Sequence, residues 1–200
     1  MASKLAVWYR RSPLLFLVSA SFIGETGIGH FGHLRVSVRA MKQTQIHFHQ
    51  TTTLTPEQYI AGLTDFGPGR SKLFGNSADE YLKVHDQGRL EADVTEGSGG
   101  IWERLHYDWS DPNHVVLTTT DSNTWGGASG HTYTFTRHSD GTTDIDADVV
   151  REGKNFKGRV LGLVLRTIGR GVLEKAFKNS VKAIEARNGA ARVRTRAAKA

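Results

Sequence analysis

Two side chains in the sequence are candidate acids or bases. Alternation along a predicted strand over residues 101–109 places Glu103 on the same face as Leu105 and Tyr107. With the two larger side chains turned inward, Glu103 would enter the interior as an acid, a base or a hydrogen-bonding anchor. His131 takes a similar place on a neighbouring strand, and a His–Glu pair across strands could transfer protons near neutral pH. The alternatives are that Glu103 pairs with an arginine or with water, and that His131 is a wall residue with one hydrogen bond.

Other acidic residues and histidines favour a solvated surface over a metal site. His47 and His49 are two apart on a predicted strand and alternate with apolar residues, so we expect them to face solvent. A row of acidic side chains resembles calcium ligands by composition only: Asp144, Asp146 and Asp148. The sequence contains no cysteine, which excludes disulfides and thiolate sites, and it has no phosphate-loop, dinucleotide, zinc-protease or serine-hydrolase motif. We therefore expect no metal and no cofactor.

The first elements that must position these residues are a strand and two short helices. Residues Thr44–Leu54 are rich in β-branched side chains and predict a half-buried strand. Thr55 is expected to cap the helix that follows, with proline at its first position and Gln58 completing a capping box. A Phe-Gly-Pro-Gly break then leaves Arg70–Gly75 room for one more helical turn.

The rest of the chain predicts a meander of strands and one long helix. The strand-like runs are Tyr81–Asp86, Leu90–Glu96, Ile101–Trp109, His114–Asp121, Thr132–Arg137 and Thr143–Arg151. Residues 122–130 are expected to form a loop. Apolar side chains at helical spacing predict a helix over Lys154–Arg187, and residues 188–200 are expected to form a disordered basic tail.

This order of elements resembles a known superfamily. The chain from Gln45 to Arg187 is similar to the START-like superfamily (SRPBCC), which includes the Bet v 1 allergens and the polyketide cyclase/dehydrase and lipid-transport proteins. It looks most like an uncharacterised actinobacterial branch. The resemblance rests on residues 51–57, 100–109, 111–112 and 156–166. It implies an α+β helix-grip fold, in which a curved antiparallel sheet wraps around a long C-terminal helix.

The resemblance also implies a hydrophobic cavity between sheet and helix that holds a lipid, a sterol, a polyketide or an aromatic molecule. The residues expected to line it are Leu105, Tyr107, Trp109, Tyr133, Phe135, Leu161, Leu165 and Ile168. We expect a carrier or sensor without enzymatic activity. The alternatives are an aromatase/cyclase that uses Glu103, Tyr107 and His131, and a peripheral lipid-binding protein at a membrane surface. The superfamily has no invariant catalytic motif, so it assigns no catalytic residue here.

The charge distribution limits the partners. The 200-residue chain has a formal net charge of +6, but residues 1–41 carry +4, residues 42–153 carry −9 and residues 154–200 carry +11. An acidic body would repel a phosphate backbone, so we expect no nucleic-acid partner. The basic C-terminal segment is expected to be a solvated face, with weak contact to a membrane surface as the alternative. We expect a monomer.

Residues 1–40 are expected to lie outside the fold, which would occupy residues 41–187. Three basic residues precede an apolar stretch over residues 13–24, an arrangement typical of a signal peptide, and that stretch is too short to span a bilayer. We favour an upstream extension with Met41 as the functional start, and hence a cytoplasmic protein. Export, or membrane association through residues 1–24, is the alternative.

Overall fold

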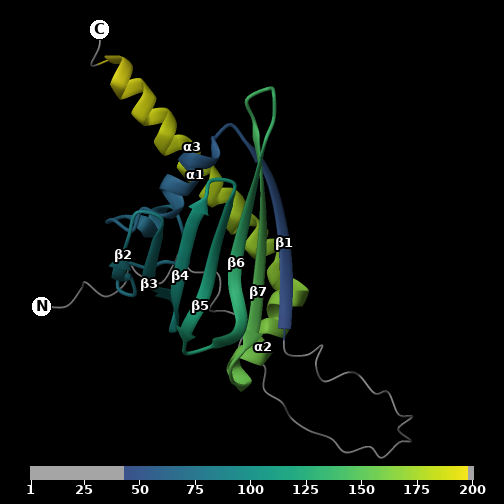
Figure 1. Cartoon of the computed structure of the whole chain (residues 1–200). Helices are drawn as coiled ribbons and strands as arrows, with labels where there is room; N and C mark the ends of the chain where they lie inside the picture. The colour runs from purple at the N-terminus through teal and green to yellow at the C-terminus, as the bar shows by residue number, and fades with distance from the viewer. Residues whose placement is uncertain (1–42, 198–200) are drawn as a thin grey trace, which may run out of the picture. The chain divides into compact units, whose positions relative to one another are not determined.

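A seven-stranded antiparallel sheet forms the body of the protein (Figure 1). The computed structural model describes residues 43–197. The strands are β1 (Gln43–Thr52), β2 (Lys83–Gln87), β3 (Glu91–Ser98), β4 (Ile101–Asp111), β5 (His114–Ser122), β6 (Trp125–Arg137) and β7 (Thr143–Gly153). They lie in the order β1-β7-β6-β5-β4-β3-β2. The strands β2 to β7 therefore follow one another in the sheet, and the first strand of the chain forms the edge beside β7.

Two short helical segments follow β1, as the sequence predicts. The Thr55 hydroxyl accepts a hydrogen bond from the backbone of Gln58, and the Gln58 side chain accepts one from the backbone of Thr55, which caps α1 (Pro56–Leu63). The second segment is a 3₁₀ turn, η3 (Arg70–Lys72). Gly69 precedes it with a φ of +88°, a left-handed conformation that glycine adopts without strain.

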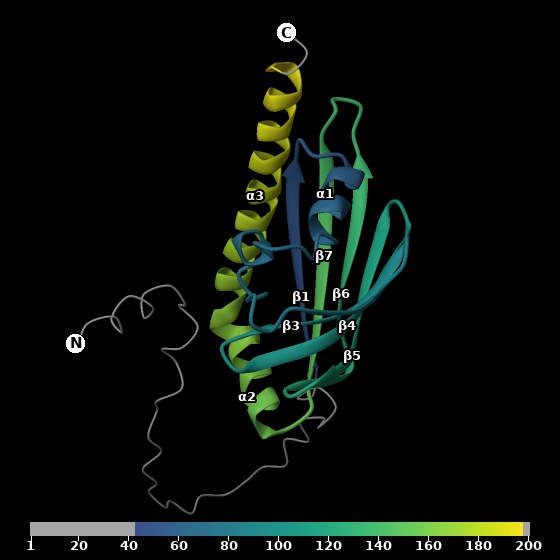
Figure 2. The ribbon, with the colours of Figure 1, turned by 90° about the vertical axis from the view of Figure 1, so that its left-hand side faces the viewer.

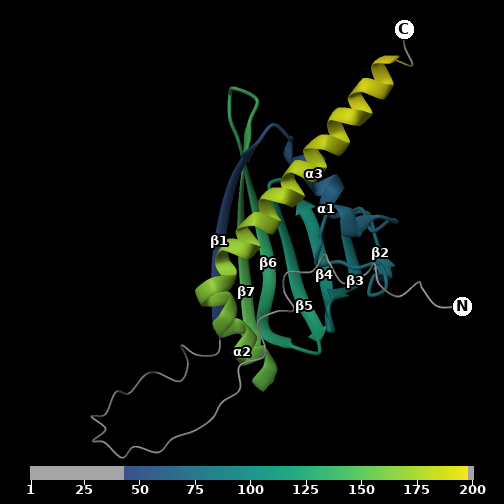
Figure 3. The ribbon, with the colours of Figure 1, turned by 180° about the vertical axis from the view of Figure 1, so that it is seen from behind.

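One continuous helix follows the sheet. It consists of α2 (Phe156–Val164), a π-helical turn over Leu165–Gly169 and α3 (Arg170–Ala197). Figures 2 and 3 show this helix lying along one face of the sheet and crossing it diagonally. The α2 segment packs against β7, and α3 packs against β1 and α1. Gly62 makes the α1–α3 contact close, because a Cβ there would lie 2.9 Å from the side chain of Ile184.

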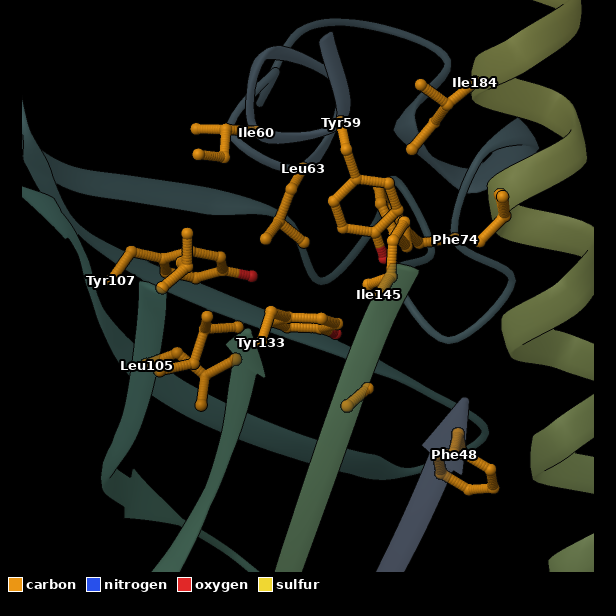
Figure 4. Packing of buried hydrophobic residues seen from close by; sticks show 14 of the residues in the cluster. Phe48, Tyr59, Ile60, Leu63, Phe74, Leu105, Tyr107, Tyr133, Ile145 and Ile184 are labelled. Carbon is orange, nitrogen blue, oxygen red and sulfur yellow. The ribbon is translucent and has the colours of Figure 1, made fainter. Parts of the chain in front are cut away.

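The hydrophobic core fills the space between the sheet, α1 and the long helix (Figure 4). The helix contributes Val181 and Ile184, and α1 contributes Tyr59 and Leu63, all of them buried. The inner face of the sheet contributes Ile46, Phe48, Ala92, Val94, Leu105, Tyr107, Val115, Leu117, Tyr133, Phe135, Ile145 and Ala147. These positions alternate with exposed or half-exposed ones along each strand, so the predicted alternation is confirmed.

The strand β6 begins earlier than the sequence predicts. Residues 122–130 were expected to be a loop, but Trp125 pairs with Gly153 and the register shifts between Gly126 and Gly130. Trp125 is buried, and the guanidinium carbon of Arg151 lies 5.6 Å from its ring centroid. Glycine has low strand propensity, so the local sequence does not indicate this strand. The tertiary contacts of the tryptophan stabilise it instead.

The helix also ends later than the sequence predicts. We expected a disordered tail from residue 188, but α3 continues to Ala197. Residues 188–197 are rich in alanine and arginine, which are strong helix formers, and they contain no proline. These propensities account for the additional helical turns. Residues 198–200 and the predicted N-terminal extension lie outside the described residues.

Candidate functional site

An internal cavity of about 40 Å³ lies between strands β3 to β6 and the chain that follows α1. Its apolar wall consists of Leu63, Phe74, Leu105, Leu117 and the rings of Tyr107 and Tyr133. Its polar wall consists of Arg70, Asn76, Glu96 and His131. A water molecule needs about 10–15 Å³ of such space, so the cavity in this conformation has room for a few waters.

A buried ionic network forms one side of the cavity. The Arg70 guanidinium is 2% exposed; its Nε donates to Glu96 and its Nη2 donates to the Tyr107 hydroxyl at 3.1 Å. Its Nη1 donates to the carbonyl oxygens of Leu63 at 2.8 Å and Asp65 at 3.0 Å. The network therefore ties the η3 turn to α1, β3 and β4, and it fixes one side of the cavity.

The same network fixes the protonation state of the tyrosines. The Tyr107 hydroxyl donates to the second oxygen of Glu96 at 2.5 Å, and Ser77 donates to the first at 2.9 Å. Burial and the negative charge of Glu96 raise the pKa of Tyr107 well above 10. Burial also raises the pKa of Tyr133 to about 12. Both hydroxyls are therefore neutral hydrogen-bonding groups at neutral pH and not bases.

A second buried ionic cluster joins β4, β6 and β7. Arg151 donates to both oxygens of Glu103, at 3.0 and 3.3 Å, and Thr119 donates to the same carboxylate at 3.0 Å. The Nη2 atom of Arg151 also lies 2.6 Å from Nε2 of His131. Because Arg151 can only donate, that nitrogen of His131 is the acceptor and the ring carries its proton on Nδ1. The structure thus brings Glu103 and His131 to 4.0 Å, with Arg151 engaged to both.

Electrostatics in this cluster oppose a proton-transfer role for Glu103. Burial alone would raise the pKa of this carboxyl group, but the charge of Arg151 and the hydrogen bond from Thr119 outweigh burial and hold the pKa at about 2. Burial and the nearby Arg151 both lower the pKa of His131. At neutral pH the carboxylate is a counter-ion to Arg151, and the imidazole is a neutral group on the cavity wall.

One buried hydroxyl has no hydrogen-bond partner among residues 43–197. The Tyr59 oxygen is buried in the core, between rings of Tyr133 and Phe135 whose centroids lie 5.8 and 5.6 Å from its own ring. Figure 4 shows the hydroxyls of Tyr59, Tyr107 and Tyr133 inside the same cluster. A buried, unpaired hydroxyl costs about 1–3 kcal/mol.

The outer face of the sheet carries a ladder of histidines and aspartates. His47 and His49 of β1 are about half exposed, as expected, and they contact the predicted acidic row across the β1–β7 pair. The Nδ1 atom of His49 lies 3.0 Å from Asp146, and that of His47 lies 3.3 Å from Asp148. In residues 43–197 no three histidine, aspartate or glutamate side chains are arranged to hold a metal ion. The ladder pairs charges across two strands on the side away from the cavity.

Comparison with known proteins gives matches by structure but not by sequence. No protein-family model and no curated protein matches the sequence. The solved structure of TTHA0849 from Thermus thermophilus matches with a TM-score of 0.55 at 13% identity, over 71% of this chain and 97% of that one. The Zhui aromatase/cyclase from Streptomyces sp. R1128 matches with a TM-score of 0.53 at 12% identity, over 71% and 91% of the two chains.

A third match is described as a START superfamily protein. The structure of a START superfamily protein from Mycobacterium smegmatis matches with a TM-score of 0.52 at 9% identity, over 72% of this chain and 95% of that one. The chain has the START-like fold. Its curved seven-stranded sheet and long C-terminal helix form the helix-grip arrangement that the sequence predicts. No helix among residues 43–197 is long and apolar enough to cross a membrane.

In the START-like fold, the predicted lining residues lie in different places: at the cavity, in the core around it, or half-buried against that core. Leu105, Tyr107 and Tyr133 line the cavity. Phe135 and Leu165 are buried in the surrounding core, and Trp109 and Leu161 are half-buried against it. The side chain of Ile168 lies outside the described part of the structure. The cavity therefore sits nearer the β3–β6 side of the sheet than the predicted set implied, and the long helix contributes to the core around it.

The sequence interpretation allowed an arginine partner for Glu103 but did not identify it, and it did not identify the Arg70–Glu96 pair. Glu96 and Arg151 could have been found, because each continues an inward-facing series: Ala92 and Val94 precede Glu96, and alternation from Ile145 reaches Arg151. Arg70 follows a Gly-Pro-Gly break in an irregular segment, where no periodicity indicates burial. It is recognised only from its contacts in three dimensions.

Proposed function

We propose that this protein binds a hydrophobic small molecule, such as a lipid, a polyketide or an aromatic compound, in the interior of its START-like fold. The observation that carries the proposal is the cavity beneath the sheet, where leucine and tyrosine side chains surround a few polar groups. Ligand sites combine these features: a mostly apolar wall excludes water, and a few polar atoms orient the ligand. The polar wall of Arg70, Asn76, Glu96 and His131 supplies such atoms here.

The cavity must enlarge to admit such a ligand, because drug-sized molecules occupy roughly 300–1,000 Å³. The proposal assigns the movement to residues 73–82, which connect η3 to β2 and have no regular structure beyond turns. Phe74 and Asn76 of this segment line the cavity. Among the described residues, one backbone hydrogen bond joins this segment to the sheet, from Ala78 to Gly97 at 2.8 Å, and the others are local turns. Outward movement of Phe74 would extend the cavity while Arg70 keeps its place.

Titration with the apolar dye N-phenyl-1-naphthylamine tests the proposal. We expect enhanced, blue-shifted dye fluorescence with the full chain and at least tenfold weaker binding by Leu117→Phe, because the larger ring fills the cavity that Leu117 lines. Leu90→Phe is the matched control: Leu90 is 37% exposed, and its replacement should leave dye binding unchanged. Thermal melts establish that both variants fold. Absence of dye binding, or equal binding by Leu117→Phe, would refute the cavity site.

An aromatase/cyclase is the alternative function, and two of the similar structures carry that description: Zhui and the di-domain protein StfQ. The carrier is preferred because the candidate acid and base, Glu103 and His131, are both held by Arg151. Such an arrangement suits an anchor for a polar ligand atom better than a proton-transfer pair. The proposal further includes a monomeric protein in the cytoplasm.

A further inference from the structure

The helix α2 packs on the sheet through its smallest residues. Gly158 and Gly162 are buried, and a Cβ on Gly158 would lie 2.3 Å from the carbonyl oxygen of Thr124. The Thr44 hydroxyl donates to the carbonyl oxygen of Gly162 at 3.0 Å. The helix backbone therefore lies directly on the sheet backbone, and no large side chain of α2 is needed to make this contact.

Three large apolar side chains of α2 point the other way, while Leu161 is half-buried against the core. Phe156, Val160 and Leu163 are 82%, 40% and 59% exposed, and their spacing of four and three residues places them on one face. We call these three residues the apolar stripe. A surface helix of a globular protein normally turns such a face toward the core. The helix therefore has apolar side chains on two faces, and the stripe is exposed among the residues that the structure describes.

Positive charge surrounds the apolar stripe. Residues 154–173 contain five basic and no acidic side chains. Lys157, Arg159, Arg166 and Arg170 are exposed, and none of them forms an ion pair with another described residue. Arg166 and Arg170 also line an open groove of about 430 Å³ beside β1. The face therefore offers apolar side chains at its centre and unpaired cations at its margin.

We propose that α2 docks on the surface of a bilayer that contains anionic lipids. The apolar stripe enters the boundary between headgroups and acyl chains, and the basic side chains bind lipid phosphates. Two other occupants are disfavoured by charge. A second copy of the chain would bring two strongly basic faces together. Residues 1–41 carry a net charge of +4 and would also be repelled by this face. Figure 1 places α2 at the end of the sheet opposite α1. This inference is independent of the cavity proposal.

Site-specific fluorescence tests the docking surface, and the absence of native cysteine makes single labelling straightforward. The full chain carrying Leu163→Cys is labelled with an environment-sensitive fluorophore and mixed with vesicles of 70% phosphatidylcholine and 30% phosphatidylglycerol. We expect a blue shift that is absent with pure phosphatidylcholine and that weakens as salt increases. Val84→Cys is the matched control, because Val84 is a 39% exposed valine on β2 and should show no shift.

Substitutions test whether a membrane, and not another part of the protein, covers the apolar stripe. Phe156→Ser combined with Leu163→Ser should weaken sedimentation with these vesicles at least tenfold, whereas Val84→Ser combined with Leu90→Ser should leave it unchanged. Since all four side chains are exposed, the thermal midpoint should hardly change. Equal sedimentation of both double variants would overturn the proposal. A label at residue 163 that is already shielded before vesicles are added, with or without concentration-dependent oligomers, would also overturn it, because the stripe would then be covered by the chain itself or by a second copy.

Discussion

Replacing Arg70 by methionine is expected to lower the free energy of unfolding by about 3–5 kcal/mol, because removing one partner of a buried ion pair leaves the other charge buried and uncompensated. The variant keeps the apolar stem between Phe66 and Phe74, whose ring centroids both lie 4.8 Å from the guanidinium carbon. It leaves the Glu96 carboxylate without its cation and the carbonyl oxygens of Leu63 and Asp65 without a donor. Urea denaturation followed by tryptophan fluorescence measures the effect.

Two further variants serve as controls for the effect of Arg70→Met on the free energy of unfolding. Arg104→Met removes a cation that pairs with Asp93 at 3.4 Å but is 41% exposed, so the free energy of unfolding should change by less than about 1 kcal/mol. Arg70→Met combined with Glu96→Met should be less destabilised than Arg70→Met alone, because no buried charge then lacks a partner. A loss below about 1 kcal/mol for Arg70→Met would show that the network does not hold the η3 turn in place.

The Glu103–Arg151 pair is expected to make stability depend on pH in the acid range. Arg151 holds the pKa of Glu103 at about 2, against an ordinary value of 4.5. The folded state therefore binds this proton less readily than the unfolded chain, so the contribution is complete above about pH 4.5 and is lost as the pH falls toward 2. The difference in pKa corresponds to roughly 3 kcal/mol. Chemical denaturation at several values between pH 2.5 and 7 follows the loss.

The variant Glu103→Gln should lose a similar amount, roughly 3 kcal/mol, at pH 7, because Arg151 then stays buried without a charged partner. It should also show a smaller further loss on acidification than the natural chain. Glu57→Gln is the control, since Glu57 pairs with Arg137 at the surface and both side chains are at least half exposed. An unchanged pH profile in Glu103→Gln would contradict the assignment of Glu103 as an ionised counter-ion.

Local patterns in the sequence predict most of the fold. The capping box at Thr55 specifies where α1 begins, and alternation predicts the inward faces of β4 and β7. Local sequence patterns do not predict a strand whose formation depends on tertiary contacts. The β6 residues around Trp125 are an example, because the contact with Arg151 stabilises them. The long helix was predicted, and Leu161 and Leu165 of its apolar series face the core as expected. The exposed apolar residues on its opposite face, Phe156, Val160 and Leu163, were not predicted.

The candidate site is less predictable than the fold. Sequence alternation correctly brings Glu103 and His131 to one interior region, since both lie on inward-facing strand positions. It does not reveal that Arg151 binds both of them, because the partner lies 48 residues away from Glu103 on a strand that is not its neighbour. The role changes accordingly, from a proposed acid–base pair to a fixed ionic cluster beside the cavity.

Native mass spectrometry of the full chain, purified without denaturation, tests the central claim most directly. The account predicts an adduct of a few hundred daltons that is retained under gentle ionisation and absent from Leu117→Phe, while Leu90→Phe retains it. The bare mass of the chain, unchanged after incubation with N-phenyl-1-naphthylamine, would contradict an internal site for a hydrophobic molecule. So would an adduct that Leu117→Phe retains in full, because the bound molecule would then lie outside the cavity that Leu117 lines.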